Sequence, residues 1–99
     1  NHDYGDYTRW ESDQAKAANL VSLKKVHQEI GFKLLLDDSV KIHKDGQSIA
    51  LIGVENWGKG GFHKYGNLNH AVANVSNDEF KILMSHDPSH WEAKTLEHE

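Results

Sequence analysis

Apolar residues recur every three or four positions through one long stretch of the chain, residues 13–30. The main ones are Ala17, Leu20, Leu23 and Ile30. This spacing places them on one face of a helix. Ser12 or Asp13 is available as the N-cap, and Gly31 follows as a stop signal. We therefore predict a helix over residues 13–30.

Beyond Gly31, apolar and polar residues alternate with the two-residue period of strands. The predicted strands span residues 32–38, 39–43 and 48–56. Asp45-Gly46 lies between the last two and favours a tight hairpin turn. Residues 49–54 are apolar at successive positions, which indicates a central strand covered on both faces. A strand of that kind needs a layer on each side, so the predicted fold class is α/β.

The remaining chain alternates loops with short elements. Residues 57–67 hold four glycines in eleven positions and are predicted to form a loop, a frequent place for functional residues. A short helix is expected over 68–75 and a strand over 79–85. Pro88 favours the first turn of a helix, which we predict over 88–98.

Length and composition narrow the classes of protein. The 99 residues suit a single domain with one modest core. A net charge of −4 with a single arginine, Arg9, offers no basic stripe, so we expect no nucleic-acid binding. The absence of cysteine excludes disulfides, thiolate nucleophiles and Cys-ligated zinc. Eight histidines are unusual and point to metal binding or acid–base chemistry, with purely structural histidines as the alternative.

Two of these histidines, His86 and His90, stand four positions apart. Histidines at this spacing on one helix hold zinc in HExxH enzymes. Pro88 lies between them and marks a helix start, so the pair should straddle a strand-to-helix turn. His86 alone then sits at the carboxyl end of a strand, where open α/β sheets bind ligands. It is either a metal ligand or a residue that caps the strand by hydrogen bonding.

Three stretches, taken in order, resemble the calcineurin-like metallophosphoesterases. They are NHDY at residues 1–4, GVENW at 53–57 and ILMSHDP at 82–88. The signature of that family runs DxH, GDxxD, GNH(D/E), a later histidine at a strand end, and GHxH. The chain starts one residue inside the third block and lacks the first, second and fifth. It resembles an internal fragment, residues 1–99, of such a domain.

The resemblance implies part of a four-layer α/β/β/α sandwich and a hydrolase that cleaves a phosphomonoester, phosphodiester or pyrophosphate with a water activated by two metals. By the same resemblance, Asn1 and His86 ligate metal. His2 contacts the phosphate and protonates the leaving oxygen, while Asp3 orients His2. The intact enzyme is expected to carry two divalent ions, Mn, Fe, Zn or Mg. With only two matched ligands, the chain alone is expected to bind metal weakly or not at all and to be inactive.

The glycine-rich loop supplies the candidate substrate-binding residues, with a solvated surface loop as the alternative. They are Trp57, Lys59, His63 and Lys64. The expected substrate is a phosphorylated small molecule or lipid. A domain fragment should expose apolar surface and self-associate. Its location, cytoplasmic or membrane-associated, depends on segments outside this stretch. The competing interpretation of the whole chain is a non-enzymatic α/β binding module with structural histidines.

Overall fold

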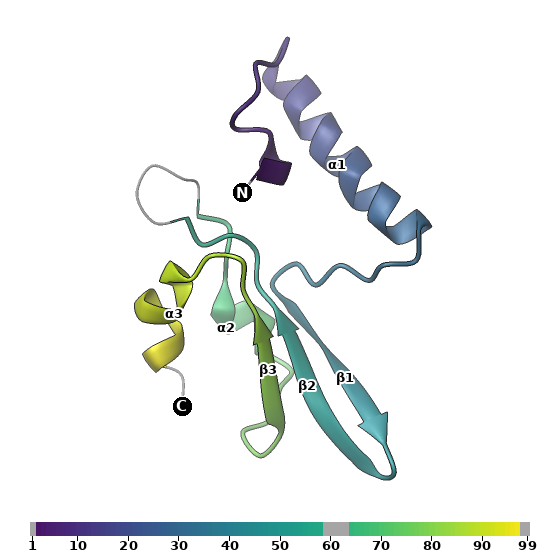
Figure 1. Cartoon of the computed structure of the whole chain (residues 1–99), viewed down its shortest axis with the longest axis vertical. Coiled ribbons are helices and arrows are strands. Elements are labelled where there is room, and N and C mark those ends of the chain that lie inside the picture. Colours follow the sequence, from purple (N-terminus) through teal and green to yellow (C-terminus); the bar gives the residue numbers. More distant parts are fainter. Residues whose placement is uncertain (1, 59–63, 98–99) are drawn as a thin grey trace. The chain divides into compact units, whose positions relative to one another are not determined.

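The computed structural model describes residues 2–58 and 64–97 (Figure 1). The chain forms two compact units, Asn1–Leu34 and Leu35–Glu99. It is a mixed α/β protein with one three-stranded sheet and a few helices. Within the described ranges, no helix combines the length and the apolar character needed to cross a membrane.

The first unit is built around the helix that the sequence predicts, α1 (Asp13–Glu29). The Ser12 hydroxyl caps it by accepting a hydrogen bond from the backbone N–H of Ala15 at 3.1 Å. Gly31 follows its last turn with a φ of 91°, a left-handed conformation that commonly ends helices. Both predicted boundaries are therefore confirmed, and each follows from a local cap.

The second unit holds the sheet, in the order β1-β2-β3 (Figure 1). Its strands are β1 (Asp38–Lys44), β2 (Gln47–Gly53) and β3 (Phe80–Met84). β1 and β2 pair antiparallel, whereas β2 and β3 pair parallel. Asp45 and Gly46 have φ angles of 52° and 77°, as a two-residue hairpin turn with both central residues left-handed requires. The predicted hairpin turn and the central position of the second hairpin strand are confirmed.

The predicted strand over residues 32–38 is wrong, because only Asp38 belongs to a strand. The chain turns at Asp37, whose φ is 51°. The Asp37 carboxylate accepts hydrogen bonds from the backbone N–H groups of Glu55 and Asn67. These distant partners hold Asp37 in a bent conformation, so an extended strand cannot continue through it.

The other predicted elements form at the expected places, with shorter lengths. Strands 39–43 and 79–85 are confirmed as the cores of β1 and β3, and strand 48–56 ends earlier, at Gly53. The helix expected over 68–75 is a single turn, α2 (Leu68–Ala71). The helix expected over 88–98 is α3 (Ser89–Ala93), followed by a 3-10 turn, η2 (Thr95–Glu97). Valine and asparagine follow α2 and are poor helix formers, which accounts for its early end.

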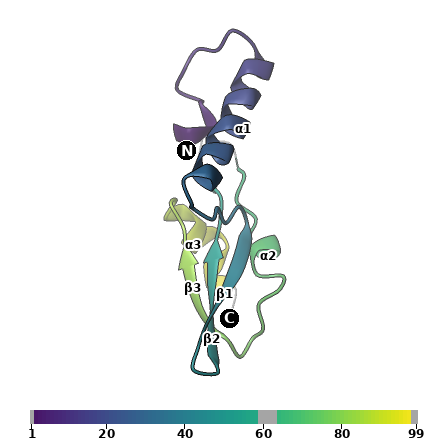
Figure 2. The same cartoon turned by 90° about the vertical axis from the view of Figure 1, so that its right-hand side faces the viewer.

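The core of the second unit lies on one face of the sheet, where α2 packs (Figure 2). Ile52 and Val54 contact Leu68 and Ala71 of α2 to form the buried cluster. The partly buried side chains of Val72, Val75 and Leu83 surround that cluster. One short helix thus covers one face of the central strand.

The opposite face of the sheet is apolar and largely uncovered. The strand register places seven side chains on it: Val40, Ile42, Ile49, Leu51, Phe80, Ile82 and Met84. Phe80 is 69% exposed and Met84 47%, whereas Ile49 and Leu51 of β2 are half-buried. We call these seven residues the open sheet face. The prediction of a central strand covered on both faces is therefore confirmed for one face only.

Candidate functional site

The parallel pairing of β2 and β3 brings the carboxyl ends of both strands to one edge of the sheet. The N–H of Val54 donates to the carbonyl of Met84 at 3.3 Å, which extends the pairing one residue further. The loops that leave this edge begin with residues 54–58 and 85–88. This edge is the usual position of ligand sites in α/β sheets.

Asp87 ties these two loops together. Its carboxylate accepts the backbone N–H of Gly58 at 2.8 Å across the gap between the loops. The same carboxylate accepts the backbone N–H of Ser89 at 2.9 Å and the Ser89 hydroxyl at 2.7 Å. We call this set of hydrogen bonds the Asp87 clamp. It joins the turn that follows His86 to the loop that carries Trp57.

Asp37 performs a similar task on the other side of the loop. This residue is only 7% exposed, and its carboxylate accepts the N–H groups of Glu55 at 3.0 Å and Asn67 at 2.8 Å. Its carbonyl oxygen lies 2.6 Å from Nδ1 of His70. A buried carboxylate with several hydrogen bonds of this kind is a structural anchor. It fixes the start of α2 against the loop after β2.

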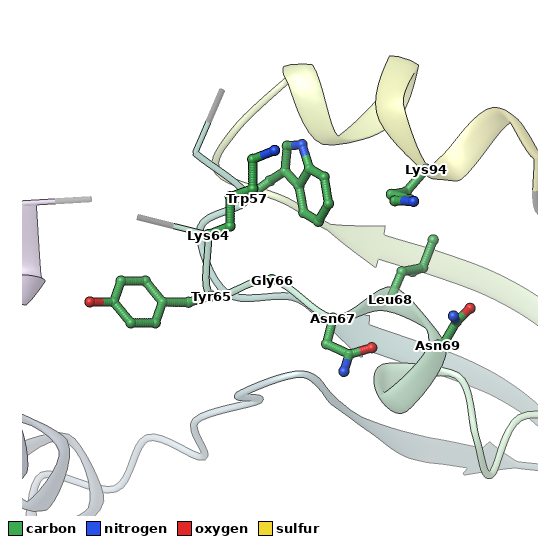
Figure 3. A pocket seen from close by; sticks show the side chains of 8 residues that line it. All are labelled: Trp57, Lys64, Tyr65, Gly66, Asn67, Leu68, Asn69 and Lys94. Atoms are coloured by element: carbon green, nitrogen blue, oxygen red, sulfur yellow. The ribbon is translucent and has the colours of Figure 1, made fainter. Parts of the chain in front are cut away.

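A pocket of about 290 Å³ opens beside Trp57 (Figure 3). Lys64 and Lys94 line it and place their Nζ atoms 4.9 Å and 5.7 Å from the centroid of the indole. Both distances lie within the range of cation–π attraction. Amide side chains contribute to the wall, from Asn67 and Asn69. The pocket thus combines two positive charges, an indole and amides.

His90 of α3 supports the indole from inside the protein. The rings of Trp57 and His90 stack with centroids 4.9 Å apart and an interplanar angle of 9°. His90 is completely buried, and neither of its ring nitrogens finds a hydrogen-bond partner within the described ranges. Burial lowers the pKa of His90, against the opposing influence of the Asp37 and Asp87 carboxylates. The imidazole is therefore held neutral, as a flat support for Trp57.

The predicted catalytic residues lie in the first unit. His2 and Asp3 belong to a 3-10 turn, η1 (His2–Tyr4), and both side chains are exposed. The imidazole of His2 stacks on the ring of Tyr7, with centroids 4.6 Å apart. Exposure leaves these groups accessible to a substrate.

The other predicted residues divide into three groups. Asn1, Lys59 and His63 lie outside the described residues. His86 is exposed in the turn that follows β3, as the strand-end position predicts. Trp57 and Lys64 are brought together in the pocket. The prediction that His86 and His90 straddle a strand-to-helix turn is also confirmed.

Two features of this site could not be found by sequence reasoning. They are the contact of Lys94 with Trp57 and the stacking of His90 beneath Trp57. Lys94 follows α3 directly, and its contact with Trp57 joins distant positions of the chain. No local pattern marks either contact, because both depend on how α3 returns to the sheet edge. The helix prediction that begins at Pro88 was the nearest signal.

The structure gives no metal centre among residues 2–58 and 64–97. No group of three or more His, Asp or Glu side chains lies close enough together to hold an ion there. A catalytic divalent ion takes at least three protein ligands in most sites. The described residues do not by themselves fit a two-metal centre.

Comparisons with protein-family models, with curated proteins and with solved structures each found no match.

Proposed function

We propose that the chain is part of a metal-dependent phosphoesterase that hydrolyses a phosphomonoester, a phosphodiester or a pyrophosphate. One observation supports this most directly. The Asp87 clamp joins the ILMSHDP stretch to Gly58, the residue directly after GVENW, and these are two of the three stretches that resemble metallophosphoesterases. They meet at the edge of the sheet where α/β proteins usually bind ligands, beside a pocket with two lysines. Lysine is a common phosphate ligand.

The fold proposed for the intact domain is the four-layer α/β/β/α sandwich. The open sheet face supports this, since seven apolar side chains on one side of a sheet are suited to packing against a second sheet. The helix on the opposite face, α2, would belong to one outer layer in such a domain. The second sheet would be supplied by segments beyond these 99 residues.

The proposed roles of the site residues follow the resemblance. Asn1 and His86 are metal ligands, and the exposure of His86 next to the Asp87 clamp agrees with such a role. His2 contacts the phosphate and protonates the leaving oxygen, chemistry that imidazole performs near neutral pH. Asp3 orients His2. Asn1 and His86 would hold metal together with ligands from outside this chain, and the chemistry that two divalent ions would supply there is activation of water and neutralisation of phosphate charge.

The test uses a longer natural protein that contains these 99 residues. We expect it to hydrolyse an aryl phosphate with added Mn²⁺, to lose activity in EDTA, and to fall by about a hundredfold or more in His2→Ala and His86→Ala. Lys44→Ala, an exposed position on β1, is the matched control and should keep full activity. Metal-independent turnover, or turnover untouched by His2→Ala, contradicts the proposal.

A second candidate function is a non-enzymatic binding module. It is favoured by His90, which is buried beneath Trp57 as a structural histidine would be. The same assay separates the two candidates. A binding module would take up a phosphorylated ligand at the pocket without turnover under any metal condition.

A further inference from the structure

Lys64 and Lys94 approach the same indole from two different segments. Lys64 precedes α2, and Lys94 follows α3. Their Nζ atoms lie 4.9 Å and 5.7 Å from the ring centroid of Trp57. Two ammonium groups placed around one small pocket repel each other, and a dianion between them relieves that repulsion.

The described residues do not neutralise the charge of these two lysines. Across the described ranges, neither one forms an ion pair with a carboxylate. Lys16, Lys25 and Lys41 do form such pairs. The pocket is therefore a place where positive charge is concentrated and left available for a ligand, which is how sites for anions are built.

The size and the chemistry of the pocket restrict that ligand. Its volume of about 290 Å³ lies at the lower edge of the range for small-molecule sites. It suits a phosphate group with a small attached part. Among the described residues, the lining consists of tryptophan, lysine, tyrosine, glycine, asparagine and leucine, with no His, Asp or Glu. The described lining thus offers neither imidazole nor carboxylate to a metal, and it shares no residue with those assigned to metal binding.

We propose that the Trp57 pocket binds a phosphate group of the substrate other than the one that is hydrolysed. The substrate class is then a compound that carries at least two phosphates. Lys64 and Lys94 neutralise the second phosphate, and Trp57, fixed by its stacking on His90, forms a rigid wall. This inference rests on the proposed phosphoesterase function only in assuming that another phosphate of the substrate is hydrolysed. Binding of a phosphate group at the pocket does not depend on that function.

The binding step is tested with the 99-residue chain in EDTA. Inorganic phosphate is added at about pH 8, where it is a dianion, and amide and indole N–H signals are followed by NMR. We expect saturable shifts at the Trp57 indole and at the backbone N–H of Gly66 and Asn69. Lys64→Gln and Lys94→Gln should each weaken binding about tenfold, the typical loss for one charged hydrogen bond. Lys44→Gln, equally exposed on β1, is the control and should bind as the unmodified chain does.

Binding at the pocket is contradicted if phosphate causes no saturable shifts, or if the shifts are the same in Lys64→Gln and Lys94→Gln as in the unmodified chain. Shifts that appear only after Mg²⁺ is added contradict it as well. A second measurement uses the longer protein. Lys94→Gln should raise KM about tenfold for a bisphosphorylated substrate and raise KM for an aryl monophosphate by much less. An equal effect on both substrates contradicts a second phosphate. Loss of all turnover in His2→Ala tests the phosphoesterase function separately, because it involves no pocket residue.

Discussion

His90 has lost contact with water without gaining a hydrogen bond, and this makes it the most unusual residue of the described chain. It is fully buried, stacked on Trp57 and near two acidic anchors, Asp37 and Asp87. Both carboxylates favour its protonated form, and Lys94 opposes them. Burial outweighs the acids, so the pKa of His90 is lowered from its ordinary 6.5. The neutral ring is what allows close stacking in an apolar setting.

This predicts a loss of stability in mild acid. In the unfolded chain, His90 takes up a proton near its ordinary pKa of 6.5, whereas the folded chain resists protonation until lower pH. The free energy of unfolding should therefore fall as pH drops through about 6.5, and the fall should end once the folded pKa is passed. Urea denaturation between about pH 5 and pH 8 measures it.

The matched variants are His90→Phe, which keeps a flat ring under Trp57, and His43→Gln, at an exposed position on β1. His90→Phe should lose the part of the pH dependence that lies below neutrality. His43→Gln should keep it. An unchanged pH profile in His90→Phe would show that another group carries the effect.

At the scale of elements, α1 depends on its ends. None of its residues is buried, and Val21 within the helix and Ile30 directly after it are more than half exposed. Isolated helices of this length are marginal in water, so caps contribute a large share of their stability. Ser12 and Gly31 supply those caps.

The same substitution at two places on α1 should therefore have opposite effects. Ser12→Ala removes the N-cap and should cost the helix about 1 kcal/mol. Ser22→Ala, at an exposed mid-helix position, replaces serine with a better helix former and should stabilise it by a few tenths of a kcal/mol. Circular dichroism at the helical band and amide exchange of α1 measure both. Equal effects of the two changes would mean that the cap does not hold the helix.

At the scale of the whole molecule, the open sheet face is the dominant feature of the second unit. Phe80, Ile82 and Met84 of β3 are each more than 40% exposed on it. Contiguous apolar surface of this kind on a soluble protein marks an interaction surface or a liability to aggregation. β3 is also an edge strand, which adds unpaired backbone groups beside that face.

We expect the 99-residue chain to self-associate through the open sheet face. Ile82→Lys places a charge in the middle of it and should shift the chain toward monomer. Asn77→Lys adds the same charge in an exposed turn and should not. Sedimentation velocity at low and high concentration gives the distribution. A monomer at all concentrations, or an equal response to both variants, contradicts the prediction.

Local signals explain which parts of the fold could be predicted from the sequence. α1, the Asp45-Gly46 hairpin and β3 were predicted because each depends on a cap, a turn dipeptide or an alternation within a few residues. The bend at Asp37 was missed because its hydrogen-bond partners, Glu55 and Asn67, are far along the chain.

The candidate site divides in the same way. Motifs in the sequence point to His2, His86 and the Trp57 loop. The pocket itself could not be predicted, because it forms only when Lys94, after the last helix, reaches the loop after β2. Packing between distant segments brings the positive charges of Lys64 and Lys94 together. No short pattern in the sequence encodes such packing.

The Asp87 clamp limits how the two loops at the sheet edge can change during evolution. The Asp87 carboxylate bonds to both loops. The segment that begins at Gly53 must therefore span a fixed distance for the N–H of Gly58 to reach that carboxylate. An insertion in that segment would detach the loop from the turn that presents His86. Among relatives, we therefore expect insertions and deletions after Gly58. Between Gly53 and Gly58, we expect a change in length only where the turn that contains Asp87 changes too.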